Sequence, residues 1–122
     1  MRDAVIAKIA AGESLEQAEL AGVDLRGVDL HDADFRKANL SQAKLNGANL
    51  QAANLSESNL RAAHLSQANL ADANLSRANL VWANLRGANL SGADLHEAIY
   101  DNTTILPEHF EPEEAGMVRS TE

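Results

Sequence analysis

The chain has 122 residues, a formal net charge of −8 and an aromatic content of only 3%. This length suits a single domain, and so few aromatic residues exclude an ordinary core of large and varied side chains. The absence of cysteine excludes disulfides and thiolate metal sites.

The negative charge is concentrated near the C-terminus. Residues 18–98 contain nine acids and seven bases, whereas residues 99–122 contain six acids and one base. No stripe of basic residues stands out along the sequence, so we expect no direct binding to nucleic acid.

The sequence also bears on membranes and location. Residues 1–8 are too charged to be the core of a signal peptide, and no uncharged apolar run is long enough to span a bilayer. We therefore expect no membrane association. A chain without cysteine suits a reducing compartment, and we expect a cytoplasmic location.

The first predicted element is a short helix over residues 3–11, within an N-terminal helical cap of residues 1–17. Val5, Ile6 and Ile9 would share one face of this helix. Asp3 suits its start and Gly12 suits its end. Such a cap would cover the exposed end of the domain that follows.

Residues 18–98 carry a repeat of five residues. Leu or Phe stands at every fifth position from Leu20 to Leu95, with a small residue, usually Ala, two positions earlier. This spacing would scatter the leucines around an α-helix and alternate them between the two faces of a flat strand. All of them can point inward only if the chain bends by a similar angle in every repeat, which predicts a β-solenoid.

Each copy reads Ala-Asx-Leu followed by two variable residues, here called X1 and X2, as in residues 68–72. This pattern resembles the pentapeptide-repeat family over residues 18–98. The resemblance implies an all-β fold, a right-handed quadrilateral β-helix with four repeats per coil and therefore about four coils.

Each position of the repeat has an expected role in such a coil. Leu and the small residue would face inward, Asx would hydrogen-bond nearby main chain, and X1 and X2 would face water. Ser58 replaces the inward Ala in one copy, and we expect its hydroxyl to bond a local carbonyl.

The repeat fails after Ala98, and residues 99–122 are predicted to form a C-terminal cap and an acidic flexible tail. Ile105, Leu106 and Phe110 are the expected plugs of the last coil. Residues 111–122 are acidic and polar, so we expect them to be disordered.

No catalytic constellation is apparent. The four histidines, His31, His64, His96 and His109, do not share a column of the predicted coil, so we expect no histidine metal site. No serine has a histidine and a carboxylate placed around it, and no Gly-rich phosphate loop occurs. We therefore expect no catalytic residue, no metal, no cofactor and no enzymatic activity.

The one unusual surface feature is Val81 followed by Trp82, at X1 and X2 after Leu80. Arg61 would lie one coil below Val81. A solvent-facing Trp beside Val and Arg has the composition of a binding hot spot, so these three residues are the candidate partner-binding site. The alternative interpretation, which fits the sequence equally well, is that a terminal segment folds against them.

These observations predict a structural solenoid that presents a rigid surface to an unidentified protein partner, as a monomer or a weak end-to-end dimer. The family that the chain resembles is abundant in cyanobacteria. The resemblance implies an alternative, because some pentapeptide-repeat proteins inhibit DNA gyrase by mimicking duplex DNA. A duplex as long as the predicted coil, roughly 20 Å, would show about twelve charges. Residues 18–98 have a net charge of only −2, nine acids against seven bases, which favours the first prediction.

Overall fold

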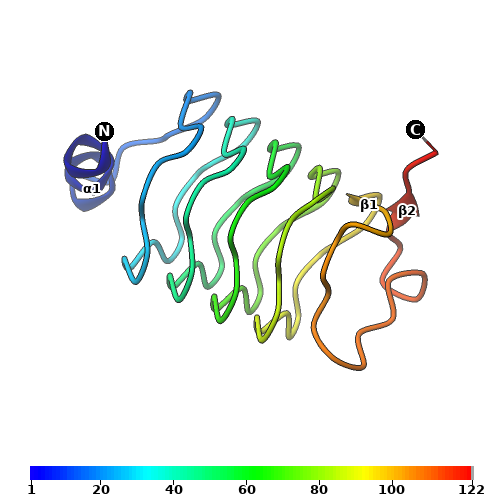
Figure 1. The fold of residues 1–122 in the computed structure, drawn as a ribbon. Coiled ribbons are helices and arrows are strands. Elements are labelled where there is room, and N and C mark those ends of the chain that lie inside the picture. Colours follow the sequence, from blue (N-terminus) through cyan, green and yellow to red (C-terminus); the bar gives the residue numbers. More distant parts are fainter. Residues whose placement is uncertain (122) are drawn as a thin grey trace.

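The computed structural model describes residues 1–121, so Glu122, the last residue of the predicted tail, lies outside the described residues. The elements are α1 (Arg2–Ala10), β1 (Ile99–Tyr100) and β2 (Val118–Arg119). Between α1 and β1 the chain winds as a repeat β-helix whose coils stack side by side, with α1 at one end and the C-terminal segment at the other (Figure 1). Within residues 1–121, no helix is long and apolar enough to cross a membrane.

The sequence predicted a helix over residues 3–11, and α1 begins and ends one residue earlier than that. Gly12 follows it with a left-handed φ of 74°, and its N–H donates to the carbonyl of Ile9 (3.0 Å). The N–H of Glu13 donates to the carbonyl of Lys8 (2.9 Å), which completes a Schellman motif. Val5 is buried, while Ile9 is partly buried against the same core.

The coils are held together by parallel pairing of residues twenty apart. The bridges fall into four columns, which begin at Glu19, Asp24, Asp29 and Asp34. Two hydrogen bonds recur in every column. The Asx N–H donates to the preceding coil and the Leu N–H donates to the following coil, with N···O distances close to 2.9 Å.

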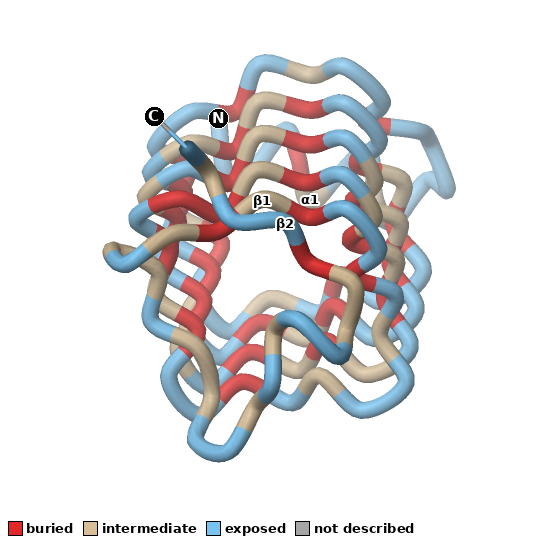
Figure 2. The backbone as a smooth tube through the Cα atoms, turned by 90° about the vertical axis from the view of Figure 1, so that its right-hand side faces the viewer, coloured by how far each residue is buried: buried red, intermediate tan, exposed pale blue. Residues whose placement is uncertain are grey.

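The leucines form the interior. Every Leu or Phe of the repeat between Leu25 and Leu85 has no exposed surface, and the small residues before them are nearly as deeply buried, except the partly buried Val28. Figure 2 shows these buried positions lining the inside of the coil, with exposed residues at the corners. Leu90 is only partly buried, because its column ends at Asn89 and no further coil covers it.

Each corner is a tight turn built from X1 and X2. The N–H of the residue after X2 donates to the carbonyl of the preceding Leu, as from Ala68 to Leu65 (3.1 Å). Every X2 residue from Gln17 to Glu97 has a left-handed φ between 59° and 73°, although few of them are glycine. A side chain in this conformation costs roughly 1–3 kcal/mol, and the hydrogen bonds on both sides of the turn hold it there.

The Asx residues support the same corners from outside. The Oδ1 atom of the Asx accepts from the N–H of X1, as Asn69 does from Ala71 (3.1 Å). The expected role of Asx is thereby confirmed. The expected bond of the buried Ser58 is confirmed as well, because its hydroxyl donates to the carbonyl of Leu55 (2.7 Å).

One expected plug of the last coil is wrong. Ile105 is 49% exposed, because it pairs with Asn84 and therefore stands in the outward-facing Asx column. Leu106 takes the inward position after it. Leu106 and Phe110 pack against the core, as expected.

The expected disorder of the C-terminal tail is also wrong for its described part. Residues 112–116 form a turn, Met117 is buried, and β2 pairs in parallel with β1. The N–H of Ser120 donates to the carbonyl of Tyr100 (2.7 Å). Burial of Met117 and the backbone bonds of β2 offset the entropic cost of ordering this acidic segment.

Replacement of Leu70 by Ala is expected to lower the free energy of unfolding by about 2–5 kcal/mol, because a coil fixed on both sides cannot collapse onto the cavity. Urea or thermal denaturation measures the loss. Gln67→Lys, at an exposed corner of the same coil, is the control and should leave stability nearly unchanged. An unaltered melting temperature for Leu70→Ala would contradict the stacked interior.

Candidate functional site

Arg61, Val81 and Trp82 lie at the same corner of two neighbouring coils. The N–H of Ala62 donates to the carbonyl of Val81 (2.9 Å), which places Arg61 and Ala62 beside Val81 and Trp82. The backbone of Trp82 is left-handed, with φ 67°. The structure therefore brings the three candidate residues together.

Only two of the three are available to a partner. Trp82 is 58% exposed and Arg61 is also exposed, whereas Val81 is 5% exposed. The expectation that both residues after Leu80 face water is wrong for Val81. The candidate surface is reduced to the indole of Trp82 and the guanidinium of Arg61.

A C-terminal segment, residues 101–104, covers Val81. Asn79 pairs with Ile99, but Asn84 pairs with Ile105, so the chain has gained one residue between the two bridges. The extra length lets the side chains of this segment reach back to the corner. It covers Val81, as the alternative interpretation of the sequence expected, and leaves the indole of Trp82 exposed.

Two threonines attach this segment to the corner. Thr103 Oγ1 accepts from the N–H of Trp82 (2.9 Å), and Thr104 Oγ1 donates to the carbonyl of Leu80 (2.9 Å). Sequence reasoning missed both residues. The available signal was that threonine occurs only outside the coils, where a hydroxyl can replace a missing backbone partner.

Asp101 organises the two threonines. It accepts from the N–H of Thr103 (2.8 Å) and from the Thr103 hydroxyl, and its own N–H donates to Thr104 Oγ1 (3.2 Å). These bonds to Thr103 hold the pKa of Asp101 below its ordinary value, and the nearby cations Arg61 and Arg119 lower it further. The carboxylate is thus kept charged beside the candidate surface.

A second set of contacts fixes the end of the chain. The hydroxyl of the buried Tyr100 donates to Glu113 Oε1 (2.6 Å), which raises the pKa of Tyr100 and lowers that of Glu113. The guanidinium of Arg119 lies 5.1 Å from the centre of the Tyr100 ring and donates to Asn102 Oδ1 (2.6 Å). Residues 101–104 are therefore held from both sides.

Within residues 1–121, no serine, histidine and carboxylate are hydrogen-bonded in series. His31 Nδ1 lies 2.8 Å from Asp29 Oδ1, but both side chains are exposed. Ser14 Oγ donates to Asp34 Oδ2 (2.7 Å) and has no histidine partner. Among residues 1–121, no group of three or more histidines and carboxylates could hold a metal ion.

Two cavities lie outside the coil, at its N-terminal end. One, of about 410 Å³, is lined by Ile9, Ser14, His31 and several carboxylates. The other, of about 340 Å³, lies between α1 and the first coil and is mostly apolar. Ser14 and Asp34 both line the first cavity, but the ion pair with Arg36 lowers the pKa of Asp34 and makes its carboxylate a weak base. No histidine bonds the Ser14 hydroxyl, so the arrangement of a catalytic triad is not formed there.

A family model described as pentapeptide repeats matches residues 14–51 and 53–92, in 8 copies. The chain belongs to the pentapeptide-repeat family. No curated protein matches it. Membership accounts for the period of five residues and for the repeat β-helix.

Several solved structures of pentapeptide-repeat proteins are similar. Alr5209 from Nostoc PCC 7120 is 42% identical over 97% of this chain and 94% of its own, with a TM-score of 0.51. Rfr23 from the cyanobacterium Cyanothece 51142 is 35% identical over 68% and 63%, with a TM-score of 0.40.

HetL, from the cyanobacterium Nostoc sp. strain PCC 7120, is involved in the regulation of heterocyst differentiation. It is 26% identical over 87% of this chain and 61% of its own, with a TM-score of 0.53. This chain thus spans less than two thirds of the length of HetL.

Replacement of Thr104 by Val should remove the bond from Thr104 Oγ1 to the carbonyl of Leu80 and leave the N–H of Asp101 without its partner, at a cost of about 1–3 kcal/mol. Chemical denaturation measures this loss. Amide exchange of Trp82, whose N–H donates to Thr103 Oγ1, should also accelerate, because residues 101–104 would detach more often. Thr121→Val, a similar change near the end of the chain, is the control. Equal exchange in the Thr104 variant and the wild type would contradict the attachment.

The pKa of His31 is raised by its bond to Asp29, with a smaller contribution from the charge of Asp32. The bond between protonated His31 and Asp29 therefore stabilises the folded protein fully at a pH below the pKa of an unfolded histidine, near 6.5. This stabilisation is lost as the pH rises through the higher pKa that His31 has in the folded protein. Asp29→Asn should return the titration of His31 towards its ordinary value in an NMR experiment, whereas Asp72→Asn should not. An unchanged titration in Asp29→Asn would contradict the pairing.

Proposed function

We propose that this pentapeptide-repeat protein is a non-enzymatic binding module that presents a rigid outer surface to a protein partner. The exposed indole of Trp82 carries the proposal. It is 58% exposed although its backbone N–H is fixed to Thr103. A large aromatic side chain on a backbone that loses little freedom on binding is a favourable anchor.

The proposed shape is a right-handed, four-sided β-helix of about four coils, capped by α1 and by residues 99–121. The four columns of bridges with a period of twenty residues support four sides. Burial of Val5 at one end, and of Tyr100 and Met117 at the other, supports the two caps. Covered ends favour a monomer, or at most a weak end-to-end dimer. We place the protein in the cytoplasm, because a chain without cysteine suits a reducing compartment.

A role in binding rather than catalysis follows from how the inside of the coil is filled. The stacked leucines occupy the space in which a buried substrate site would lie. The similarity to HetL, a protein involved in the regulation of heterocyst differentiation, supports a regulatory role exerted through contact. The DNA-mimic alternative lacks a continuous acidic face, because Lys44, Arg61 and Arg86 are exposed along the coils.

Replacement of Trp82 by Ala is expected to weaken partner binding by about 2 kcal/mol or more, roughly thirtyfold in Kd. The fold should persist, because the Trp82 side chain is exposed and Ala, like Trp, has a Cβ that the left-handed backbone at this position already accommodates. Affinity capture from native lysate with wild type and variant side by side, followed by mass spectrometry, provides the measurement. Circular dichroism and a melting curve check the fold.

Gln42→Ala is the matched control, since Gln42 is an exposed X2 residue in the same column as Trp82 with φ 59°. It should retain every protein that the wild type captures. The proposal fails when Trp82→Ala and wild type capture the same proteins in the same amounts.

A further inference from the structure

One side of the β-helix collects exposed cations. Its Asx column runs through Asp24, Lys44, His64, Asn84 and Ile105, which are joined by consecutive parallel bridges. We call the exposed residues Lys44, Arg61, His64, Trp82 and Arg86 on this side the cationic face.

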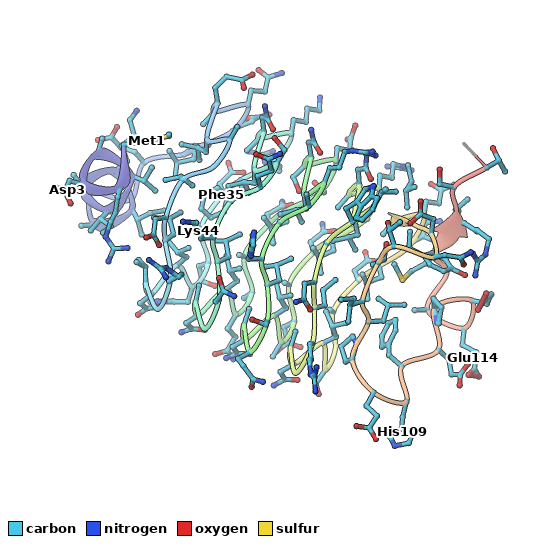
Figure 3. The ribbon with its side chains drawn as sticks, in the orientation of Figure 1. Met1, Asp3, Phe35, Lys44, His109 and Glu114 are labelled. Atoms are coloured by element: carbon cyan, nitrogen blue, oxygen red, sulfur yellow. The ribbon has the colours of Figure 1, made fainter. Side chains whose placement is uncertain are left out.

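The coils set the spacing of this face. The N–H of His64 donates to the carbonyl of Ala43 (2.8 Å), so Lys44 and His64 stand on adjacent rungs, roughly 4.8 Å apart. Trp82 and Arg86 flank the column at the two corners of the next coil, four residues apart. Figure 3 labels Lys44 on its coil, well away from Glu114 in the acidic C-terminal segment. The face thus spans three successive coils at a rigid, regular spacing.

The cations of this face lack carboxylate partners. Within the described residues, no carboxylate oxygen lies within 4.0 Å of Lys44, Arg61 or Arg86. By contrast, Arg77 on another side pairs with Glu97 at 2.9 Å.

The two acids on this side are already engaged. Asp24 forms a close ion pair with Arg26 (2.7 Å), and Asp101 is bonded to Thr103. The charge of Asp101 acts on Arg61 without forming an ion pair, and it offsets only one of the three positive charges of Lys44, Arg61 and Arg86. A local positive potential therefore remains on a protein whose formal net charge is −8.

We propose that the cationic face binds an acidic segment of the partner, with Lys44 and Arg61 facing its carboxylates and an apolar side chain packing on Trp82. This inference rests on the proposed function, because it names the chemistry of the protein partner. Complementary charge would steer the encounter and select the partner, while the indole supplies apolar contact area. The exposed Ile105 at the end of the same column extends the apolar part.

A protein segment fits this face better than nucleic acid does. Three Lys or Arg side chains neutralise few phosphates, and the rest of the chain is strongly acidic and would repel a polyanion. A mixed acidic and apolar peptide meets both halves of the face. A nucleic acid would use only the cations and the stacking surface of one indole.

The test uses the full chain and exploits Trp82 as the only tryptophan, so its fluorescence reports directly on the face. The probe is a short synthetic peptide of alternating Glu and Leu, titrated at low and at high salt. A Gln and Leu peptide of the same length and an oligothymidylate are the comparison ligands. We expect a saturable change of emission with the Glu peptide, weaker at high salt.

The double variant Lys44→Gln, Arg61→Gln should weaken binding of the Glu peptide roughly tenfold. The matched control is Lys37→Gln, Arg77→Gln, which removes the same charge from another side and should bind like the wild type. Both variants keep Trp82 as the reporter, and melting curves confirm that both are folded.

Four results would overturn the acidic-segment proposal. The Gln peptide binds as tightly as the Glu peptide, the oligothymidylate binds more tightly than either, or the Lys44 and Arg61 variant binds unchanged. The fourth is sedimentation showing self-association that this variant abolishes, since the occupant would then be a second copy of the chain.

The same variants separate this proposal from the proposed function in the capture experiment. Loss of the captured protein with Trp82→Ala, but not with the Lys44 and Arg61 variant, leaves the binding module intact and removes its acidic specificity. If neither variant changes capture, the proposed function itself is wrong.

Discussion

The whole structure depends on backbone pairing between residues twenty apart. That pairing places each leucine on the leucine of the next coil and excludes water from the interior, as the complete burial of Leu25 to Leu85 shows. Hydrophobic burial of each such side chain contributes about 1.5–3 kcal/mol. The backbone hydrogen bonds and the burial of the leucines depend on the same register between coils. A shift of one coil against the next would therefore lose both, and this holds the outer side chains at a fixed spacing.

The candidate surface benefits from this rigidity twice. Trp82 is fixed by its own coil and by Thr103 from the segment that follows β1, while the Tyr100, Glu113 and Arg119 contacts hold that segment in turn. A partner would therefore meet a surface that is already ordered. Little conformational entropy remains to be lost there on binding.

The sequence predicted the interior well, because a period of five constrains Leu and Ala strongly and leaves few alternatives. It also predicted the bond of Ser58, since a buried hydroxyl needs a partner. It could not predict the insertion at residues 101–104 or the order of Met117, which depend on contacts with no periodic signal. The sequence did not predict the clustering of Lys44, Arg61 and His64 either, because these residues become neighbours only when successive coils are aligned in space.

The left-handed backbone at X2 has a consequence for how such a protein changes over time. The conformational penalty is similar for Gln, Lys or Trp at these positions, since all carry a Cβ. One exposed residue can thus replace another without any new demand on the coil. Substitutions at the X2 positions can therefore change which side chains the corners expose, and with them the contacts of the protein, while the β-helix itself stays the same.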